Sequence, residues 1–152
     1  MRAELRLEAR VKICVGSRCV ESKNVSLYPW ASTACNALYA TPPLTPCASK
    51  IQRLDILDPN NNVIKSGNVG TDVSVSTQQI TSGSTGIIRV VYSYRDTSTD
   101  SYQVLSARLV CKDANNNDLV VHLYTMSSPV QKTSQDVLVV TWTIDLIYTA
   151  TS

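Results

Sequence analysis

Apolar and charged residues alternate near the start of the chain. Between Glu4 and Cys14 every second residue is apolar, and charged residues lie between them. A period of two residues is typical of a β-strand with one buried face, because successive side chains point to opposite sides of a sheet. The pattern predicts a strand here and a hairpin partner over residues 18–25, joined by a two-residue turn at Gly16-Ser17.

The chain after Lys50 consists of β-branched and apolar runs separated by short polar turns. Parallel strands would need helical crossovers, which this pattern lacks. We therefore expect an all-β protein whose residues 1–152 form a single antiparallel β-sandwich domain, jelly-roll-like or Ig-like. The expected strands are Ile51–Leu57, Val63–Lys65, Thr71–Ile80, Gly86–Tyr94, Tyr102–Cys111, Leu119–Tyr124 and Val137–Tyr148.

One segment departs from the two-residue period. Apolar residues recur at helical spacing after Pro29, and proline suits the first turn of a helix. We expect one short helix near residues 29–40. The prolines within residues 41–46 predict a loop after it.

Charged residues are scarce. They make up 17% of the 152 residues, hydrophobic residues make up 43%, and the net charge is +2. About a quarter of the residues is charged in an average soluble protein. A nearly neutral surface suits a protein that packs in many copies, because identical subunits repel one another weakly, and it equally suits a secreted adhesion module. The chain has no Lys/Arg cluster, so we expect no nucleic-acid partner.

The N-terminal residues MRAELRLEAR contain no continuous apolar stretch. A signal peptide and a membrane-spanning helix both require one. We therefore expect no membrane span, and synthesis in the cytoplasm of the host.

Five cysteines are many for a protein made in the cytoplasm. A two-residue turn places Cys14 directly opposite Cys19, in the closer kind of cross-strand pair, so a disulfide can form there. Cys35 and Cys47 flank the proline-rich loop and are candidates for a second disulfide, which leaves Cys111 without a partner. Disulfides of proteins made inside cells are rare outside hyperthermophiles, so the pattern favours a thermophile host or oxidation after release from the cell.

One pair of residues is a candidate catalytic nucleophile and base. It consists of Cys111 and His122, the single histidine, since an imidazole can activate a thiol. No motif or glycine-rich oxyanion loop accompanies them. We favour a buried, inert cysteine and a solvent-facing strand histidine. No catalytic residue and no cofactor is expected, and the chain is not expected to be an enzyme.

Residues 58–62 and 113–117 carry Asp and Asn at alternate positions, as a calcium loop does. The second segment continues with Asp118 and Tyr124, where an EF-hand requires Gly and Glu. Asn and Asp also tolerate the left-handed backbone of tight turns, so we interpret both segments as plain turns and expect no metal site. Further aspartates that we interpret as solvated surface charges are Asp55, Asp72, Asp96, Asp100, Asp136 and Asp145.

Trp30, Trp142 and the seven tyrosines are candidates for a sugar-stacking platform. Trp142 lies in an apolar strand, so a position in the core or in an interface is favoured. The platform supports an alternative function, a cell-surface adhesion or carbohydrate-binding module.

The stretch from Ser127 to Ile144, SSPVQKTSQDVLVVTWTI, resembles the C-terminal strand of many small structural proteins of tailed phages and related viruses. In those proteins a Pro-Val and Lys loop leads into an Asp-x-Leu-x-Val-x-Trp-x-Ile strand. The order of strands and turns from Gly86 to Tyr124 is also similar, whereas the N-terminal half has a cysteine hairpin in place of a Gly-rich segment. The resemblance implies a virion component such as a tail-fibre, baseplate, collar, turret or capsid-decorating protein. With the cysteines it favours an archaeal host.

We therefore expect a non-enzymatic virion structural protein that self-assembles or decorates a viral capsid or tail. Its expected partners are copies of itself, in a symmetric homo-oligomer, and other virion proteins. The terminal strand Val137–Tyr148 is expected to offer a free edge or an apolar face to a neighbouring subunit, and the N-terminal strand is the other candidate. The expected interface residues are Val137, Val139, Thr141, Trp142 and Tyr148.

Overall fold

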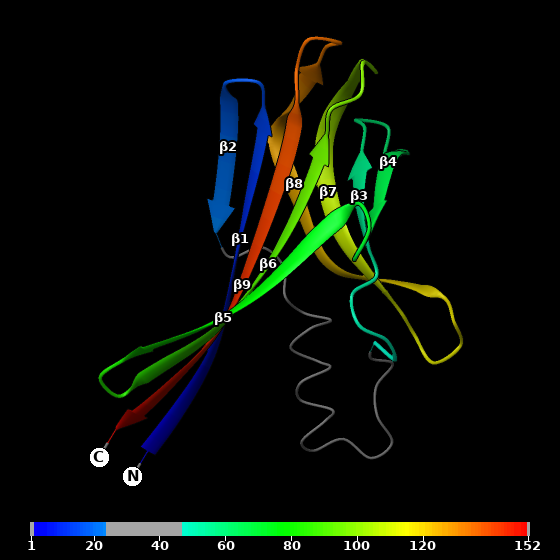
Figure 1. Cartoon of the computed structure of the whole chain (residues 1–152). Coiled ribbons are helices and arrows are strands. Elements are labelled where there is room, and N and C mark those ends of the chain that lie inside the picture. The colour runs from blue at the N-terminus through cyan, green and yellow to red at the C-terminus, as the bar shows by residue number, and fades with distance from the viewer. Residues whose placement is uncertain (1, 24–46, 152) are drawn as a thin grey trace.

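The computed structural model describes residues 2–23 and 47–151. All secondary-structure elements among these residues are β-strands. The strands form two antiparallel sheets that pack against each other (Figure 1), which confirms the predicted β-sandwich. The helix predicted near residues 29–40 lies outside the described residues. The strands are β1 (Arg2–Val15), β2 (Arg18–Lys23), β3 (Arg53–Leu57), β4 (Val63–Asn68), β5 (Val73–Ser82), β6 (Thr85–Asp96), β7 (Tyr102–Lys112), β8 (Asp118–Lys132) and β9 (Leu138–Thr151).

The chain forms the hairpins β1–β2, β3–β4, β5–β6 and β7–β8 alternately in the two sheets, and β9 then joins the first sheet as a single strand. The five-stranded sheet has the order β2-β1-β9-β6-β5, and the four-stranded sheet has the order β4-β3-β7-β8. The C-terminal strand β9 lies between β1 and β6 and pairs with both along nearly its whole length. It is therefore a central strand, although it comes last in the chain.

Apolar side chains of the two sheets form a shared core. Trp142 of β9 is the largest fully buried side chain, and its ring meets that of His122 edge-on, with 6.0 Å between the ring centroids. Every second residue of β1 from Ala9 to Val15 is buried, as the alternation predicts. Other members of the core are Leu54, Ile56, Val73, Tyr94, Val104, Leu109, Val121, Leu138 and Val140.

Strand β8 is longer than the sequence predicts. Residues 125–132, which lie beyond the strand expected over Leu119–Tyr124, continue the strand and place Val130 opposite Val104 of β7. The register shifts between Val104 and Ser106, and this irregularity accommodates extra residues on β8. Pro129 lies in this part of an edge strand, where proline removes no hydrogen bond from the interior of a sheet.

The hairpin of β1 and β2 closes through the predicted two-residue turn. Gly16 has a φ of +58°, and a Cβ at this position would lie 2.9 Å from Asp136 Oδ1, so the turn requires glycine. The turn places Cys14 opposite Cys19, and a disulfide joins them as predicted.

The two Asp-Asn segments are turns, as predicted. In each segment the aspartate carboxylate accepts hydrogen bonds of 2.8–2.9 Å from two backbone N–H groups of the same turn. Asn61 and Asn116 adopt left-handed φ angles of 66° and 64°, a conformation in which asparagine is enriched. The two turns close the hairpins β3–β4 and β7–β8 in the same way.

Candidate functional site

Four strands of the five-stranded sheet extend beyond the four-stranded sheet and form an arm (Figure 1). Continuous backbone pairing joins these four strands across the arm. The core ends where the arm begins, since Ala9 and Ile144 are its members nearest to the arm on β1 and β9. We define the arm as residues 2–8 of β1, 145–151 of β9, 85–89 of β6 and 78–82 of β5.

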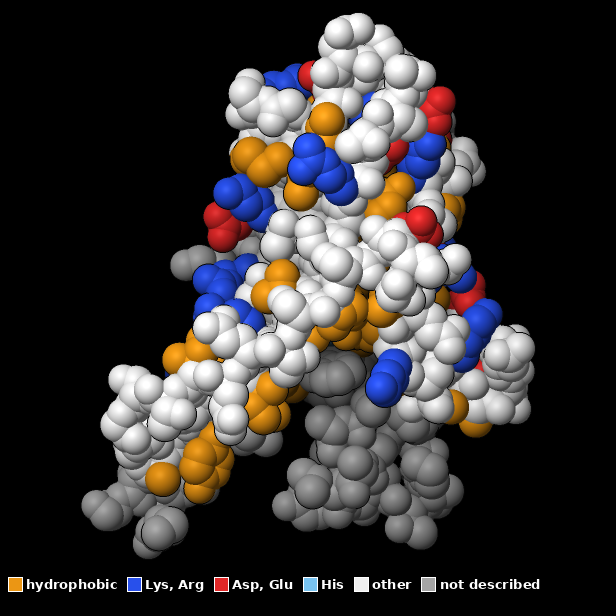
Figure 2. All heavy atoms as spheres, viewed as in Figure 1, with side chains coloured by type: hydrophobic (Ala, Val, Ile, Leu, Met, Phe, Trp, Pro, Cys, Tyr) orange, Lys and Arg blue, Asp and Glu red, His pale blue; other side chains and the backbone are white. Residues whose placement is uncertain are grey.

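One face of the arm continues the core face of the sandwich and is apolar. Leu7, Leu146 and Ile88 form a row across β1, β9 and β6. Ile88 is 46% exposed and Tyr148 is 45% exposed, and Figure 2 shows apolar side chains along the arm. A hollow of about 200 Å³ lies beside Tyr148 and Gly86. Exposed apolar residues that gather on one element are typical of contact surfaces.

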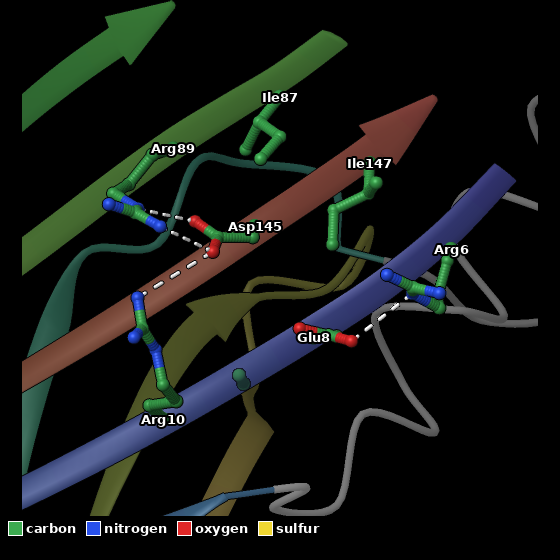
Figure 3. Close-up of a pocket in the computed structure, with 8 residues that line it drawn as sticks. Arg6, Glu8, Arg10, Ile87, Arg89, Asp145 and Ile147 are labelled. Carbon is green, nitrogen blue, oxygen red and sulfur yellow. Dashed lines mark hydrogen bonds and ion pairs between the residues drawn. The ribbon is translucent and has the colours of Figure 1, made fainter. Parts of the chain in front are cut away.

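The opposite face of the arm carries a network of ion pairs (Figure 3). Arg89 donates two hydrogen bonds, of 2.8 and 2.9 Å, to the carboxylate of Asp145. Arg10 lies 3.6 Å from the same carboxylate, and Arg6 lies 3.1 Å from Glu8. These residues line a hollow of about 440 Å³ together with Ala9, Ile87 and Ile147. Arg10 and Arg89 share the single carboxylate of Asp145, and Arg6 pairs with Glu8, so the lining keeps a net positive charge.

Both outer edges of the arm lack a neighbouring strand among the described residues. Strand β2 pairs only with residues 10–15 of β1, so residues 2–9 have β9 on one side and no described strand on the other. Strand β5 forms the opposite edge of the sheet. Backbone N–H and C=O groups at such edges are available to a strand of another chain.

The structure corrects the prediction of a free edge at the C-terminal strand. Both edges of β9 are filled, by β1 and by β6, so no further strand can pair with it. Trp142 is fully buried, and Val139 and Thr141 are half-buried on the outer face of the sheet. Val137 is also half-buried and precedes β9. Of the five predicted interface residues, Tyr148 is the exposed one.

The second disulfide also differs from the prediction. It joins Cys47 to Cys111, in place of Cys35, which lies outside the described residues. The segment after Cys47 runs beside β7, where the N–H of Ala48 donates a 2.8 Å hydrogen bond to the carbonyl of Lys112. Cys111 is therefore not a free thiol, and the hypothesis of a Cys111–His122 nucleophile pair is wrong.

His122 is buried, in contrast to the predicted solvent-facing position. It lies opposite Leu109 on the core face of β8, beside Trp142. Burial disfavours the charged imidazolium and lowers the pKa of His122 to about 4. The side chain is therefore neutral at physiological pH and packs as part of the core.

Three aspartates that we interpreted as solvated are buried: Asp55, Asp96 and Asp145. Burial raises the pKa of Asp55, but hydrogen bonds from Arg53, Ser66 and Arg108 outweigh this effect and lower the pKa overall. Arg53 lies two residues from Asp55 on the same strand, whereas Ser66 and Arg108 lie on β4 and β7, so only the strand order brings these two to Asp55. The sequence does show the alternating charges that accompany such pairs, but not which strands are neighbours.

The described residues offer little support for sugar stacking. Trp142 is buried, Trp30 lies outside the described residues, and the hydroxyl of Tyr102 donates a hydrogen bond to Asp96. No group of three or more His, Cys, Asp or Glu side chains suited to hold a metal ion occurs in residues 2–23 and 47–151.

No helix in the part of the chain that the structure describes is long and apolar enough to cross a membrane.

The arm is therefore the candidate functional surface of this molecule. Its apolar face and its open edges lie outside the core that stabilises the fold. Comparison with known protein families, with curated proteins and with solved structures finds no match to this chain.

Proposed function

We propose that this chain is a non-enzymatic structural component of a virus particle, which self-associates or decorates a capsid or tail. The observation that carries the proposal is the arm, a part of the sheet that projects beyond the sandwich with exposed apolar side chains and with outer edges that pair with no described strand. Exposed apolar side chains and unpaired strand edges are stabilised when another protein surface covers them.

The charge distribution supports the same function. The buried acidic groups are paired within the chain, as Asp145 with Arg89 and Asp55 with Arg53 and Arg108. Charged residues make up only 17% of the chain, and the net charge is +2. Identical copies therefore meet with little repulsion when they pack at high density.

The two disulfides support a particle that persists outside cells. One closes the hairpin β1–β2, and the other ties the segment before β3 to the core strand β7. Cross-links of this kind limit the freedom of the unfolded chain and stabilise the fold under oxidising conditions.

The proposal is tested on particles released by cells that carry the gene. We expect mass spectrometry of gradient-purified particles to find this chain in a constant ratio to the major capsid protein. We also expect immunogold labelling to place it at regular positions on the particles. A soluble cytoplasmic protein of the same cells serves as the control for contamination. A chain that stays in the cell fraction, with no label on particles, would contradict the proposal.

A further inference from the structure

We propose that two copies of this chain pair through the arm edge of β1, with residues 2–8 of each copy antiparallel about a two-fold axis at Leu5. This inference rests on the proposed function and names the contact that would join the subunits. The partner is a second copy of this chain, and the contact is a continuous sheet from the arm of one copy to the arm of the other.

The backbone N–H and C=O groups of the odd-numbered residues on this edge point outward, as such a pairing requires. Val15 and Arg18 flank the two-residue turn and form a hydrogen-bonded pair, so the N–H and C=O groups of odd-numbered β1 residues point toward the β2 side. The N–H of Gly16 points the other way, donating a 3.0 Å hydrogen bond to the carbonyl of Val137. Pairing of β1 with β9 continues without a register shift to Arg2. Ala3, Leu5 and Leu7 therefore present their backbone groups at the edge of β1 that no described strand occupies.

In the proposed register, hydrogen bonds form between Leu5 of the two copies, and between Ala3 of each copy and Leu7 of the other. Directly opposed residues of an antiparallel pair lie on the same face of the sheet. The apolar face of one arm therefore continues into the apolar face of the other. Even-numbered residues form the closer, non-hydrogen-bonded pairs, in which side chains interact most strongly.

The even-numbered residues of this edge are Arg2, Glu4, Arg6 and Glu8, whose charges alternate in sign. Antiparallel pairing about Leu5 places Glu4 opposite Arg6 of the second copy, and Arg2 opposite Glu8. Each cross-strand pair then joins opposite charges, which stabilises a sheet by a few tenths of a kcal/mol to about 1 kcal/mol per pair. A strand that carried charges of one sign here would instead repel its own copy.

Neighbouring registers lack this complementarity. A shift of the axis to Glu4 places Glu4 opposite itself and Arg2 opposite Arg6. A shift of the axis to Arg6 places Arg6 opposite itself and Glu4 opposite Glu8. Like charges directly opposite each other destabilise a sheet, so the charge pattern excludes axes at even-numbered residues. An axis at Ala3 or Leu7 also pairs opposite charges, but only Arg2 with Glu4 or Arg6 with Glu8 within the edge that β2 leaves uncovered. The axis at Leu5 uses residues 2–8 in full and forms the largest number of opposite-charge pairs.

The length of the open edge fits the same register. Strand β2 occupies the edge of β1 from Arg10 onward. The proposed pairing uses no residue beyond Glu8, so β2 remains in place in both copies. The other open edge, β5, carries no charged residue that could select a register in this way.

The test compares charge variants of the full-length protein by sedimentation equilibrium and light scattering over a concentration series. We expect the wild type to dimerise, and Glu4→Arg to raise the dimer dissociation constant at least about tenfold, because it creates two like-charge pairs per dimer. Arg6→Glu has the same expected effect. Arg95→Glu changes the net charge equally at an exposed position on β6 outside the arm, and it is expected to leave the dimer unchanged.

Mixing the single variants distinguishes this register from a general effect of charge. An equimolar mixture of the Glu4→Arg and Arg6→Glu variants restores opposite charges at both positions, so we expect mixed dimers of near wild-type affinity. The double variant Glu4→Arg/Arg6→Glu restores complementarity within one sequence and is expected to dimerise. Thermal unfolding of each variant verifies that it is folded.

A wild-type protein that stays monomeric at high micromolar concentration overturns the β1 pairing. An oligomer whose dissociation constant is the same in the wild type and in all these variants overturns it too. Neither result bears on whether the chain is found in purified particles, which tests the proposed function separately. If the charge variants change dimerisation as expected but the chain is absent from purified particles, the β1 pairing stands and the virion function is overturned.

Discussion

Lys132 shows how this protein holds a charged group inside the fold. Its side chain is fully buried, and its Nζ donates hydrogen bonds of 2.8 Å to the carbonyls of both Ser98 and Asp100. The ring centroid of Tyr102 lies 5.4 Å from the same nitrogen, close enough for a cation–π contact. The lysine thereby ties the loop between β6 and β7 to the end of β8. An ammonium buried without such partners would destabilise the fold by several kcal/mol.

His122 makes the stability of the fold depend on pH. Its pKa is about 4 in the folded protein, compared with 6.5 for an unperturbed histidine. Between pH 6.5 and pH 4 the unfolded chain binds more protons than the folded protein. The stabilisation that comes from keeping His122 neutral is therefore fully present above pH 6.5 and is lost as the pH falls toward 4. We expect the free energy of unfolding to fall by about 3 kcal/mol across this window. Urea unfolding at pH 7 and at intermediate pH values down to 4 measures it.

The variant His122→Leu serves as the control for this prediction. Leucine does not titrate, so the variant keeps only the pH dependence that arises from the carboxylates. The same loss of stability in both proteins over this window would show that His122 does not titrate as its burial implies.

The two disulfides close loops of very different length. The Cys14–Cys19 bridge spans a separation of 5 residues within one hairpin, whereas Cys47–Cys111 spans 64 residues and joins elements that are distant in the chain. A cross-link removes more freedom from the unfolded chain when it closes a longer loop. The long bridge is therefore expected to contribute more to stability.

We expect Cys47→Ser to lower the free energy of unfolding by about 4 kcal/mol, and Cys14→Ser by about 2 kcal/mol. Guanidinium unfolding with and without reductant measures both losses. Reductant should remove the difference between each variant and the wild type. Equal losses for the two variants would contradict the assignment of the long bridge to Cys111.

The core and the arm of the molecule differ in how deeply their apolar side chains are buried. Ile13 belongs to the core and is 2% exposed, whereas Ile88 lies on the arm and is 46% exposed. The same truncation at the two positions therefore removes very different amounts of buried apolar area.

We expect Ile13→Ala to lower the free energy of unfolding by about 3 kcal/mol and Ile88→Ala by less than about 1 kcal/mol. Denaturant unfolding at a concentration low enough to exclude association measures both values. Similar losses would show that the arm is part of the folding core.

The sequence by itself determined the local features of this protein. The two-residue alternation predicted β1, and Gly16 predicted the turn that places Cys14 opposite Cys19. The Asp-Asn segments predicted the turns before β4 and β8. These features depend on residues close in the chain, because strand pleating and turn geometry are local properties of the backbone.

Only the tertiary structure decided which strands are neighbours. The long terminal run suggested an edge strand, but β9 is central, and the open edge of the arm belongs to β1. The partner of Cys47 and the burial of Asp55 depend on the same strand order. Alternation shows that a strand has one buried face but carries no information about its neighbour, since strand order depends on the free energy of packing the whole chain.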